Sequence, residues 1–161
     1  MNGEKNKYIV RTATAAALYA ALTLSLAPIG FGPLQFRISE VLVFLVLLDR
    51  KYITGLTLGA VIANYFSPLG IIDMMVGGSA TFISLYLMIR TKNIYLSAFY
   101  PCIINGIMVG GALAWFYSLP FFLIASQVFL GQVGVIYLLG IPLFRYLQKN
   151  ADSPHIDFLS F

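Results

Sequence analysis

Long apolar stretches separated by short clusters of charge are the sequence feature that most restricts how this chain can fold. Asp, Glu, Lys and Arg make up only 10% of its 161 residues, whereas 60% are hydrophobic. About a quarter of the residues in an average soluble globular protein are charged, so a soluble domain of this composition would lack polar surface. A helical bundle in lipid suits the composition, because each spanning helix needs about 20 mostly apolar residues.

Six apolar segments are long enough, or nearly so, to cross a membrane; the second and third are short, so we expect thin or tilted helices there. The first is too long for a removable signal peptide and lacks a small-residue cleavage site. We therefore predict an all-α integral membrane protein, a single membrane domain over residues 1–161 built as a bundle of six transmembrane helices. The predicted spans are 9–27, 38–48, 52–66, 71–89, 96–116 and 121–146, with a polar cytoplasmic tail at 147–161.

The basic residues predict the orientation of these spans. A cytoplasmic N-terminus puts nine of the ten Lys and Arg residues on the cytoplasmic side and leaves only Arg37 outside. Positive residues are enriched in cytoplasmic loops, and no odd number of spans gives this asymmetry, so we predict that both termini are cytoplasmic. The net charge of +4 then reflects topology and argues against nucleic acid as a partner. The nine are Lys5, Lys7, Arg11, Arg50, Lys51, Arg90, Lys92, Arg145 and Lys149.

Metal and catalytic chemistry find little support in the sequence. Cys102 and His155 are the single cysteine and the single histidine, which excludes a disulfide framework and a metal site built on those residue types. The P-loop, G-x-S-x-G and H-E-x-x-H motifs are absent. Glu40 and Asp73 could form a carboxylate pair only if the fold brings them together. We expect no enzyme activity, no catalytic residue and no metal or cofactor bound by this chain.

Polar side chains within the apolar segments are the candidates for a binding site. A charge at the centre of a spanning helix costs roughly 2.5–3.5 kcal/mol and usually faces the bundle interior. With the predicted orientation, most of these side chains lie in the outer half of the membrane, so we predict a cavity that opens outward and no continuous pore. The candidates are Gln35, Arg37, Glu40, Asn64, Asp73, Asn105 and Gln132, with Trp115 at an outer helix end as a weaker one.

Several of these residues also have a purely structural interpretation. Arg37 and Glu40 lie three residues apart and could pair with each other. Asp73 near a helix start could complement the helix dipole, and Asn64 near a helix end could satisfy loop carbonyls.

The remaining candidates have structural alternatives too. Asn105 and Gln132 could form hydrogen bonds between helices, worth about 0.6 kcal/mol each. Trp115 could belong to the aromatic belt found at membrane interfaces. The sequence leaves all of these alternatives open.

Small residues form faces on which helices can approach closely. Ala13, Ala17 and Ala21 share one face of the first segment, and the pairs Gly55/Gly59 and Gly106/Gly110 repeat the pattern in the third and fifth segments. Most such faces serve packing within one chain. The alanine face could instead meet an external partner.

Two runs of residues resemble a known family. The first reads LAPIGFGPLQFRISE from Leu26 to Glu40, and the second reads SPLGIID from Ser67 to Asp73. The segment around Leu130-Gly131-Gln132 and the ending LGIPL at 139–143 fit as well. Over nearly its whole length the chain resembles the QueT family of queuosine-precursor transporters. Gln132 departs from the family pattern, in which Glu often follows the glycine.

The resemblance implies a substrate-binding S component of an energy-coupling-factor (ECF) transporter in a prokaryotic plasma membrane. Such proteins are six-helix bundles that capture a micronutrient at the outer face. Their partners are a transmembrane coupling (T) subunit and two cytoplasmic ATPases, which hydrolyse the ATP. By this resemblance, Ala13, Ala17 and Ala21 would meet the coupling subunit.

The implied ligand is 7-aminomethyl-7-deazaguanine or a related 7-deazaguanine base. Glu40 and Asp73 would accept from its N–H groups and neutralise its ammonium, and the amides of Gln35, Asn105 and Gln132 would cover its carbonyl and ring nitrogens. Phe31, Phe36, Trp115 or Tyr117 would stack on the plane of the base. The alternatives are an S component for another vitamin, a structural membrane subunit without a ligand, and a small oligomeric channel.

Overall fold

A computed structural model describes residues 2–32 and 34–150, and within this part of the chain it contains helices and no strands. The predicted all-α class is therefore confirmed. Residues 151–161 of the predicted tail lie outside the described part, and 147–150 belong to the last helix. In chain order the elements are α1 (Asn2–Ser25), α2 (Ala27–Gly30), the 3₁₀-helix η1 (Ile38–Phe44), α3 (Leu45–Leu48), α4 (Tyr52–Tyr65), α5 (Ile71–Met88), α6 (Ile94–Phe116), α7 (Phe121–Val135), the π-helix η2 (Ile136–Gly140) and α8 (Ile141–Asn150).

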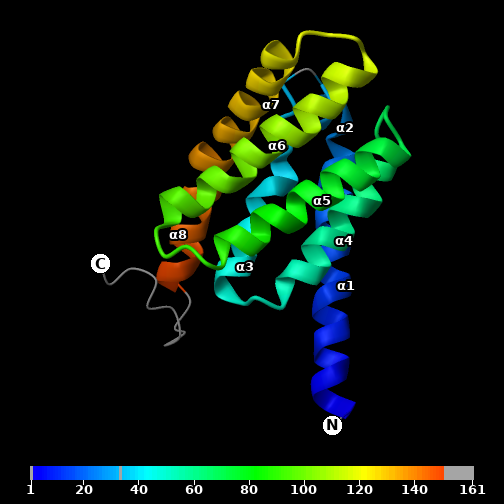
Figure 1. Cartoon of the computed structure of the whole chain (residues 1–161). Helices are drawn as coiled ribbons and strands as arrows, with labels where there is room; N and C mark the ends of the chain where they lie inside the picture. Colours follow the sequence, from blue (N-terminus) through cyan, green and yellow to red (C-terminus); the bar gives the residue numbers. More distant parts are fainter. Residues whose placement is uncertain (1, 33, 151–161) are drawn as a thin grey trace.

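The helices pack as a closed bundle. Contacts run from α1 to α4, α5, α6 and α7 in turn, and η1 closes the ring by packing against α1 on one side and α7, η2 and α8 on the other. The last three elements follow one another as a single long rod, and the start of α1 extends beyond the rest of the bundle (Figure 1). The start of α1 and the end of α8 lie at the same end of the molecule (Figure 1).

Three of the described helical stretches are long and apolar enough to cross a membrane, namely Ile71–Met88, Ile94–Phe116 and Phe121–Lys149. The stretch Ile38–Leu48 is apolar but shorter. Each of the six predicted segments is helical over most of its length, although α1 begins at Asn2, before the predicted start at residue 9, and α8 continues to Asn150, past the predicted end at residue 146. The count of six spans and their orientation stay predictions.

The second segment differs from the expected α-helix because η1 is a 3₁₀-helix. Residues three apart eclipse one another in this geometry, and each residue rises about 2.0 Å instead of 1.5 Å. Arg37 at the cap, Glu40 and Val43 therefore line up on one face, and all three are buried. The tighter coil lets a short segment extend further while it points two charged side chains inward.

Glycines allow the closest helix contacts. A Cβ atom at Gly55 would lie 2.7 Å from the carbonyl oxygen of Thr12, and one at Gly59 would lie 2.8 Å from that of Ala16. The pair Gly106/Gly110 packs in the same way against α7. These glycine faces therefore serve packing within the chain.

The alanine face is different, because Ala13, Ala17 and Ala21 are exposed on α1. Other alanines of α1, Ala15 and Ala16 among them, are the ones that are buried. The alternative that this face serves internal packing is therefore wrong.

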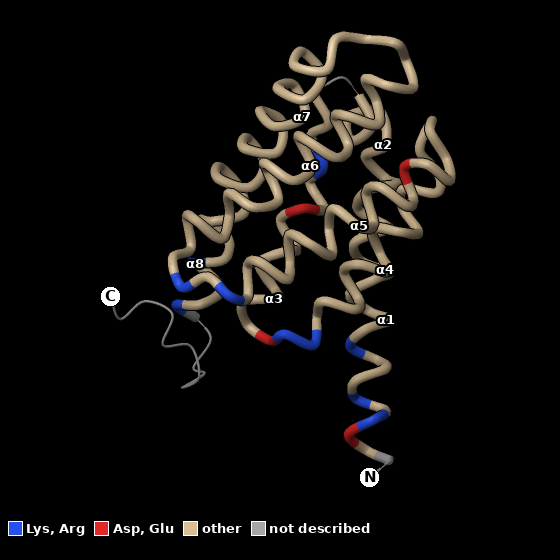
Figure 2. Tube along the Cα trace, in the orientation of Figure 1, with Lys and Arg blue, Asp and Glu red and all other residues tan. Residues whose placement is uncertain are grey.

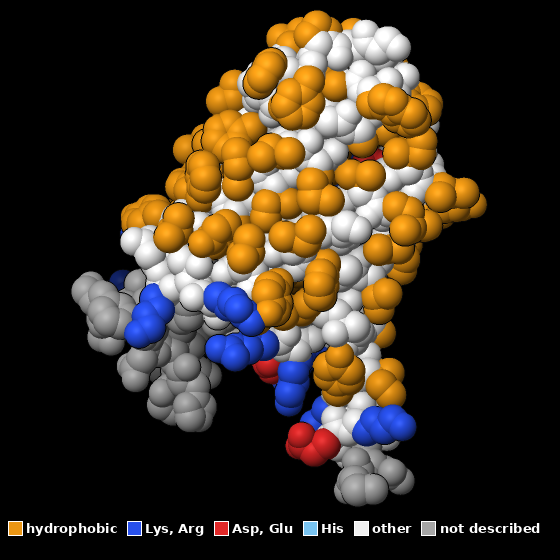
Figure 3. All heavy atoms as spheres, in the orientation of Figure 1, with side chains coloured by type: hydrophobic (Ala, Val, Ile, Leu, Met, Phe, Trp, Pro, Cys, Tyr) orange, Lys and Arg blue, Asp and Glu red, His pale blue; other side chains and the backbone are white. Residues whose placement is uncertain are grey.

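Surface charge divides the molecule. Lys and Arg residues gather at the end that holds the start of α1, the α3–α4 turn, the α5–α6 loop and the end of α8 (Figure 2). Hydrophobic side chains cover much of the flank above that end (Figure 3), and many large apolar residues are exposed there. This distribution suits a protein with lipid around its flanks and one strongly basic membrane face.

Replacing Gly59 by Val tests the α1–α4 contact. The added side chain meets the α1 backbone, so we expect a loss of about 1–3 kcal/mol of stability, as in other overpacked contacts, seen as a lower melting temperature in detergent. Leu58→Ala is the matched control, since Leu58 is 46% exposed. Equal melting temperatures for Gly59→Val and the wild type would contradict the close approach.

Candidate functional site

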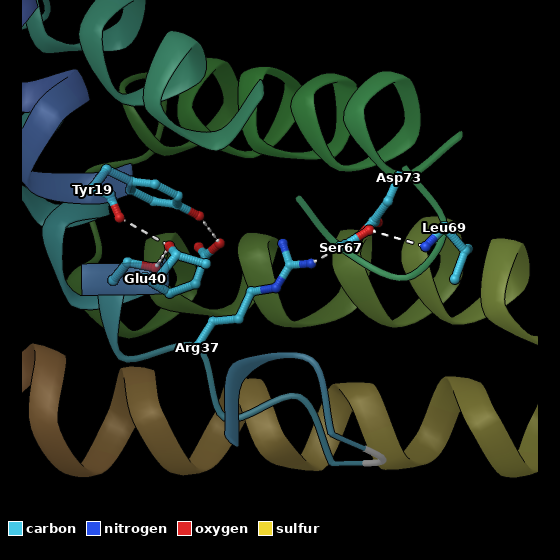
Figure 4. A network of polar contacts seen from close by, with 8 residues as sticks. Tyr19, Arg37, Glu40, Ser67, Leu69 and Asp73 are labelled. Atoms are coloured by element: carbon cyan, nitrogen blue, oxygen red, sulfur yellow. Dashed lines mark hydrogen bonds and ion pairs between the residues drawn. The ribbon is translucent and has the colours of Figure 1, made fainter. Parts of the chain in front are cut away.

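Among the described residues, three Asp, Glu, Lys or Arg side chains are buried inside the bundle: Arg37 is 2% exposed, and Glu40 and Asp73 are 1% exposed. Arg37 and Glu40 come from the start of η1, and Asp73 comes from the first turn of α5. The Arg37 Nη2 atom donates to Asp73 Oδ2 at 3.3 Å (Figure 4). Since burying a charge is costly unless it is paired, this ion pair holds η1 against α5.

Glu40 has a different partner. Its Oε1 accepts a hydrogen bond of 2.5 Å from the hydroxyl group of Tyr19, on α1 (Figure 4). The alternative that Arg37 and Glu40 pair with each other is therefore wrong, because each is bound to another helix. Among the described residues, Glu40 is the one buried carboxylate without a basic partner.

Arg37 is held from a second side by an aromatic ring. Its guanidinium carbon lies 5.3 Å from the centre of the Phe31 ring, a distance at which a cation is attracted to the ring face. Phe31 was expected to stack on a ligand base, and in the structure it stacks on Arg37.

Asp73 does not cap its helix. The N-cap of α5 is Gly70, and no side chain donates or accepts a capping hydrogen bond there. The Asp73 carboxylate lies in the first turn, where the helix dipole favours an anion, but its hydrogen bond goes to Arg37. Asp73 therefore links two helices.

Three amide side chains from three other helices are also buried, each at most 2% exposed: Asn64 on α4, Asn105 on α6 and Gln132 on α7. No hydrogen bond reaches either polar atom of the Asn64 and Asn105 amides, nor the Gln132 Oε1. Hydrogen bonding to loop carbonyls by Asn64, and between helices by Asn105, is therefore not what these amides do.

The charged residues also have unpaired atoms: Arg37 Nε, Glu40 Oε2 and Asp73 Oδ1 have no hydrogen-bond partner. Buried polar groups are nearly always paired, and an unpaired one costs about 1–3 kcal/mol. The unpaired atoms on these six candidate residues are donors and acceptors that a polar ligand could use.

A loop brings Gln35 to the same region. Gln35 is buried and has a φ of +47°, a strained conformation for a residue other than glycine. The Leu34 carbonyl lies directly over Gly131, where any Cβ would collide with it, and the Phe36 ring lies over Gly134. The loop therefore crosses α7 beside Gln132.

A glycine also positions Asn64. Its amide lies against Gly77, where a Cβ atom would collide with it. Gly77 is one helical turn after Asp73 and shares its face of α5, so Asn64 of α4 packs against the face of α5 that carries Asp73. Asn105 is also buried, but no hydrogen bond joins its side chain to the other candidate residues.

The sequence analysis differs from the structure at two residues, Trp115 and Tyr19. Trp115 is 74% exposed, so the structure does not bring it together with the other candidates; it lies at a helix end, as an interfacial aromatic residue would. Tyr19 was missed, although it binds Glu40 directly. A tyrosine in the middle of an apolar, alanine-rich segment is the signal that could have found it, because its hydroxyl group needs a partner there.

Comparison with known proteins adds a family. A family model described as QueT transporter matches residues 9–149. A protein of Lactococcus lactis subsp. cremoris (strain MG1363) named queuosine precursor transporter QueT is 42% identical over 89 residues. That match covers 54% of this chain and 52% of the relative, so it spans about half the length of each. No solved structure matches the chain.

The Arg37–Asp73 pair can be tested by breaking it and by replacing it. Asp73→Ala leaves a buried guanidinium without its counter-charge, so we expect a loss of about 3–5 kcal/mol, measured as a lower melting temperature in detergent. The double variant Arg37→Met/Asp73→Leu removes both charges and should recover most of that loss.

The ion pair between Arg11 and Asp49 is the matched control for this test, because its side chains are 40% and 33% exposed. Breaking it with Asp49→Ala should cost about 0–1 kcal/mol. A double Arg37/Asp73 variant that melts no higher than Asp73→Ala would contradict the pairing.

Proposed function

The chain belongs to the QueT transporter family, and from this membership we propose that it is the substrate-binding S component of an ECF-type importer. Its ligand is 7-aminomethyl-7-deazaguanine or a related 7-deazaguanine base. The protein captures this queuosine precursor at the outer face of a prokaryotic plasma membrane for ATP-driven uptake.

The buried carboxylate of Glu40 carries the proposal. Arg37 pairs with Asp73, so Glu40 is the carboxyl group that is left without a counter-charge when all three groups are ionised. An unbalanced buried anion is costly. A ligand with an ammonium group supplies the missing cation and forms a charge-assisted hydrogen bond with the unpaired Glu40 Oε2.

The Arg37–Asp73 pair suits the other edge of the same ligand. Asp73 Oδ1 is an unpaired acceptor, and Arg37 Nε is an unpaired donor. A guanine-like base offers the complement, with N–H donors beside a carbonyl acceptor. The pair would therefore read the base edge while Glu40 binds the aminomethyl group.

The buried amides complete the donor and acceptor set. Each amide both donates and accepts, and the unpaired atoms of Asn64, Asn105 and Gln132 suit the ring nitrogens and the remaining N–H groups. Gln132 is neutral, which leaves Glu40 as the anion for the ammonium group. Gln35 would contribute a further amide from the loop that crosses α7.

Six spans with both termini inside give this site its direction. The basic end of the bundle would face the cytoplasm (Figure 2). Asn64 lies near the end of α4, and Glu40 and Asp73 lie near the starts of η1 and α5. In each case this is the end of the element that is further along the chain from the basic loop to which the element leads or from which it comes. The ligand would therefore enter from outside.

The exposed alanines of α1 suit a partner. Ala13, Ala17 and Ala21 are free of internal contacts that would bury them, and small residues let another helix approach closely within lipid. The coupling (T) subunit would bind this face, and two cytoplasmic ATPases would hydrolyse the ATP. The chain itself would bind no cofactor and catalyse no reaction.

Ligand binding tests the proposed function. Calorimetry of the purified protein should detect binding of 7-aminomethyl-7-deazaguanine, and Glu40→Gln should weaken it about 10- to 100-fold, as expected for loss of a hydrogen bond to a charged group. Asp73→Asn should weaken it as well. Trp115→Ala is the control and should bind like the wild type. Unchanged affinity in both carboxylate variants would contradict the site, and binding of a different vitamin would contradict the ligand.

The orientation is tested separately with single cysteines in a Cys102→Ala background. Asn6→Cys and Arg50→Cys should react with an impermeant thiol reagent only after cells are opened, whereas Ser118→Cys in the α6–α7 turn should react in intact cells. These positions are exposed. Labelling of Asn6→Cys from outside would contradict the proposed topology.

A further inference from the structure

We propose that Tyr19 is a positioning residue that sets the preference of this site for a cationic ligand. It acts through Glu40 and would not touch the ligand itself. This inference rests on the proposed function, because it concerns how Glu40 meets the ammonium group.

Tyr19 is fixed before any ligand arrives. It is fully buried on α1, and its Cβ packs against Gly59 of α4. Its backbone carbonyl accepts a hydrogen bond from Thr23, whose hydroxyl also bonds to Ser39 at 2.7 Å. The ring is therefore held between α4 and η1, and its hydroxyl group reaches Glu40 in one orientation (Figure 4).

The hydrogen bond from Tyr19 makes the two oxygens of the Glu40 carboxylate different. Tyr19 occupies Oε1 at 2.5 Å, whereas Oε2 has no partner. A carboxylate with both oxygens free favours two parallel N–H donors, the arrangement that a guanine-like edge offers. With one oxygen taken, Glu40 is a single-point acceptor, which suits the ammonium group.

The phenol hydroxyl also keeps the carboxylate charged and directed. A hydroxyl has one hydrogen to donate, and here it goes to the anion. Removing it leaves Oε1 unpaired in an apolar surrounding, so the carboxylate can rotate and its charge is less well stabilised. The affinity for a cation should suffer most, and that for a neutral ligand of the same shape should suffer little.

The test compares two ligands that differ in charge at one substituent. Calorimetry gives the dissociation constants of 7-aminomethyl-7-deazaguanine, which is cationic, and 7-cyano-7-deazaguanine, which is neutral. For Tyr19→Phe we expect the ratio of the two constants to move about tenfold toward the neutral ligand, as loss of a hydrogen bond to a charged group predicts. The ratio does not depend on how much of the variant is folded, since both ligands report on the same folded fraction.

Two further variants separate positioning from general damage. Ser84→Ala removes a buried hydrogen bond within α5 that involves neither Tyr19 nor Glu40, so the ligand ratio should stay at the wild-type value. In a Glu40→Gln background, Tyr19→Phe should have no further effect on the ratio, because Tyr19 acts through that carboxylate.

The outcomes that overturn the inference are distinct from failure of the proposed function. A wild-type ratio in Tyr19→Phe, or equal weakening of both ligands, would overturn the role of Tyr19 while the protein still binds. A further change of the ratio by Tyr19→Phe in the Glu40→Gln background would do the same. Binding of neither base by the wild-type protein would instead overturn the proposed function.

Discussion

Charge removed from water inside an apolar bundle has to be balanced, and the balance between Arg37, Asp73 and Glu40 is what the rest of this structure depends on. Arg37 and Asp73 satisfy one another across η1 and α5, and Glu40 is held by a neutral hydroxyl group. The bundle therefore closes around one carboxyl group that has no basic partner among the described residues. A ligand with a positive charge would supply the missing partner of Glu40. The same buried charges would then determine both the stability of the core and the binding of the ligand.

Glycines leave space for polar residues of the site at three places. Gly131 on α7 admits the loop that carries Gln35, Gly77 on α5 admits the Asn64 amide, and Gly59 on α4 admits Tyr19. Each would collide with its neighbour if it carried a side chain. The polar groups thus reach the interior by the same close packing that holds the helices together, so the fold and the site cannot be varied independently.

The sequence predicted much of this and missed the pairings for a physical reason. Apolar segment length gave the helices, and the cost of burying charge singled out Arg37, Glu40 and Asp73. Spacing along the chain left a pair between Arg37 and Glu40 open, but a 3₁₀-helix puts both on one inward face, where each bonds to a partner on another helix, on α5 and α1 respectively. Rotation of each helix about its axis decides such contacts. The sequence alone does not give this rotation. Because of it, Trp115 is exposed and Tyr19 is buried beside Glu40.

The most direct measurement is an experimental structure of the protein bound to 7-aminomethyl-7-deazaguanine. The account predicts the ligand's amine within about 2.7–2.9 Å of Glu40 Oε2, as charge-assisted hydrogen bonds require, and the base edge on Asp73 and Arg37. A ligand in the outer groove between α6 and α7, which Phe121, Phe122 and Phe129 line, would contradict it. So would a ligand among the buried polar residues whose amine makes no contact with Glu40.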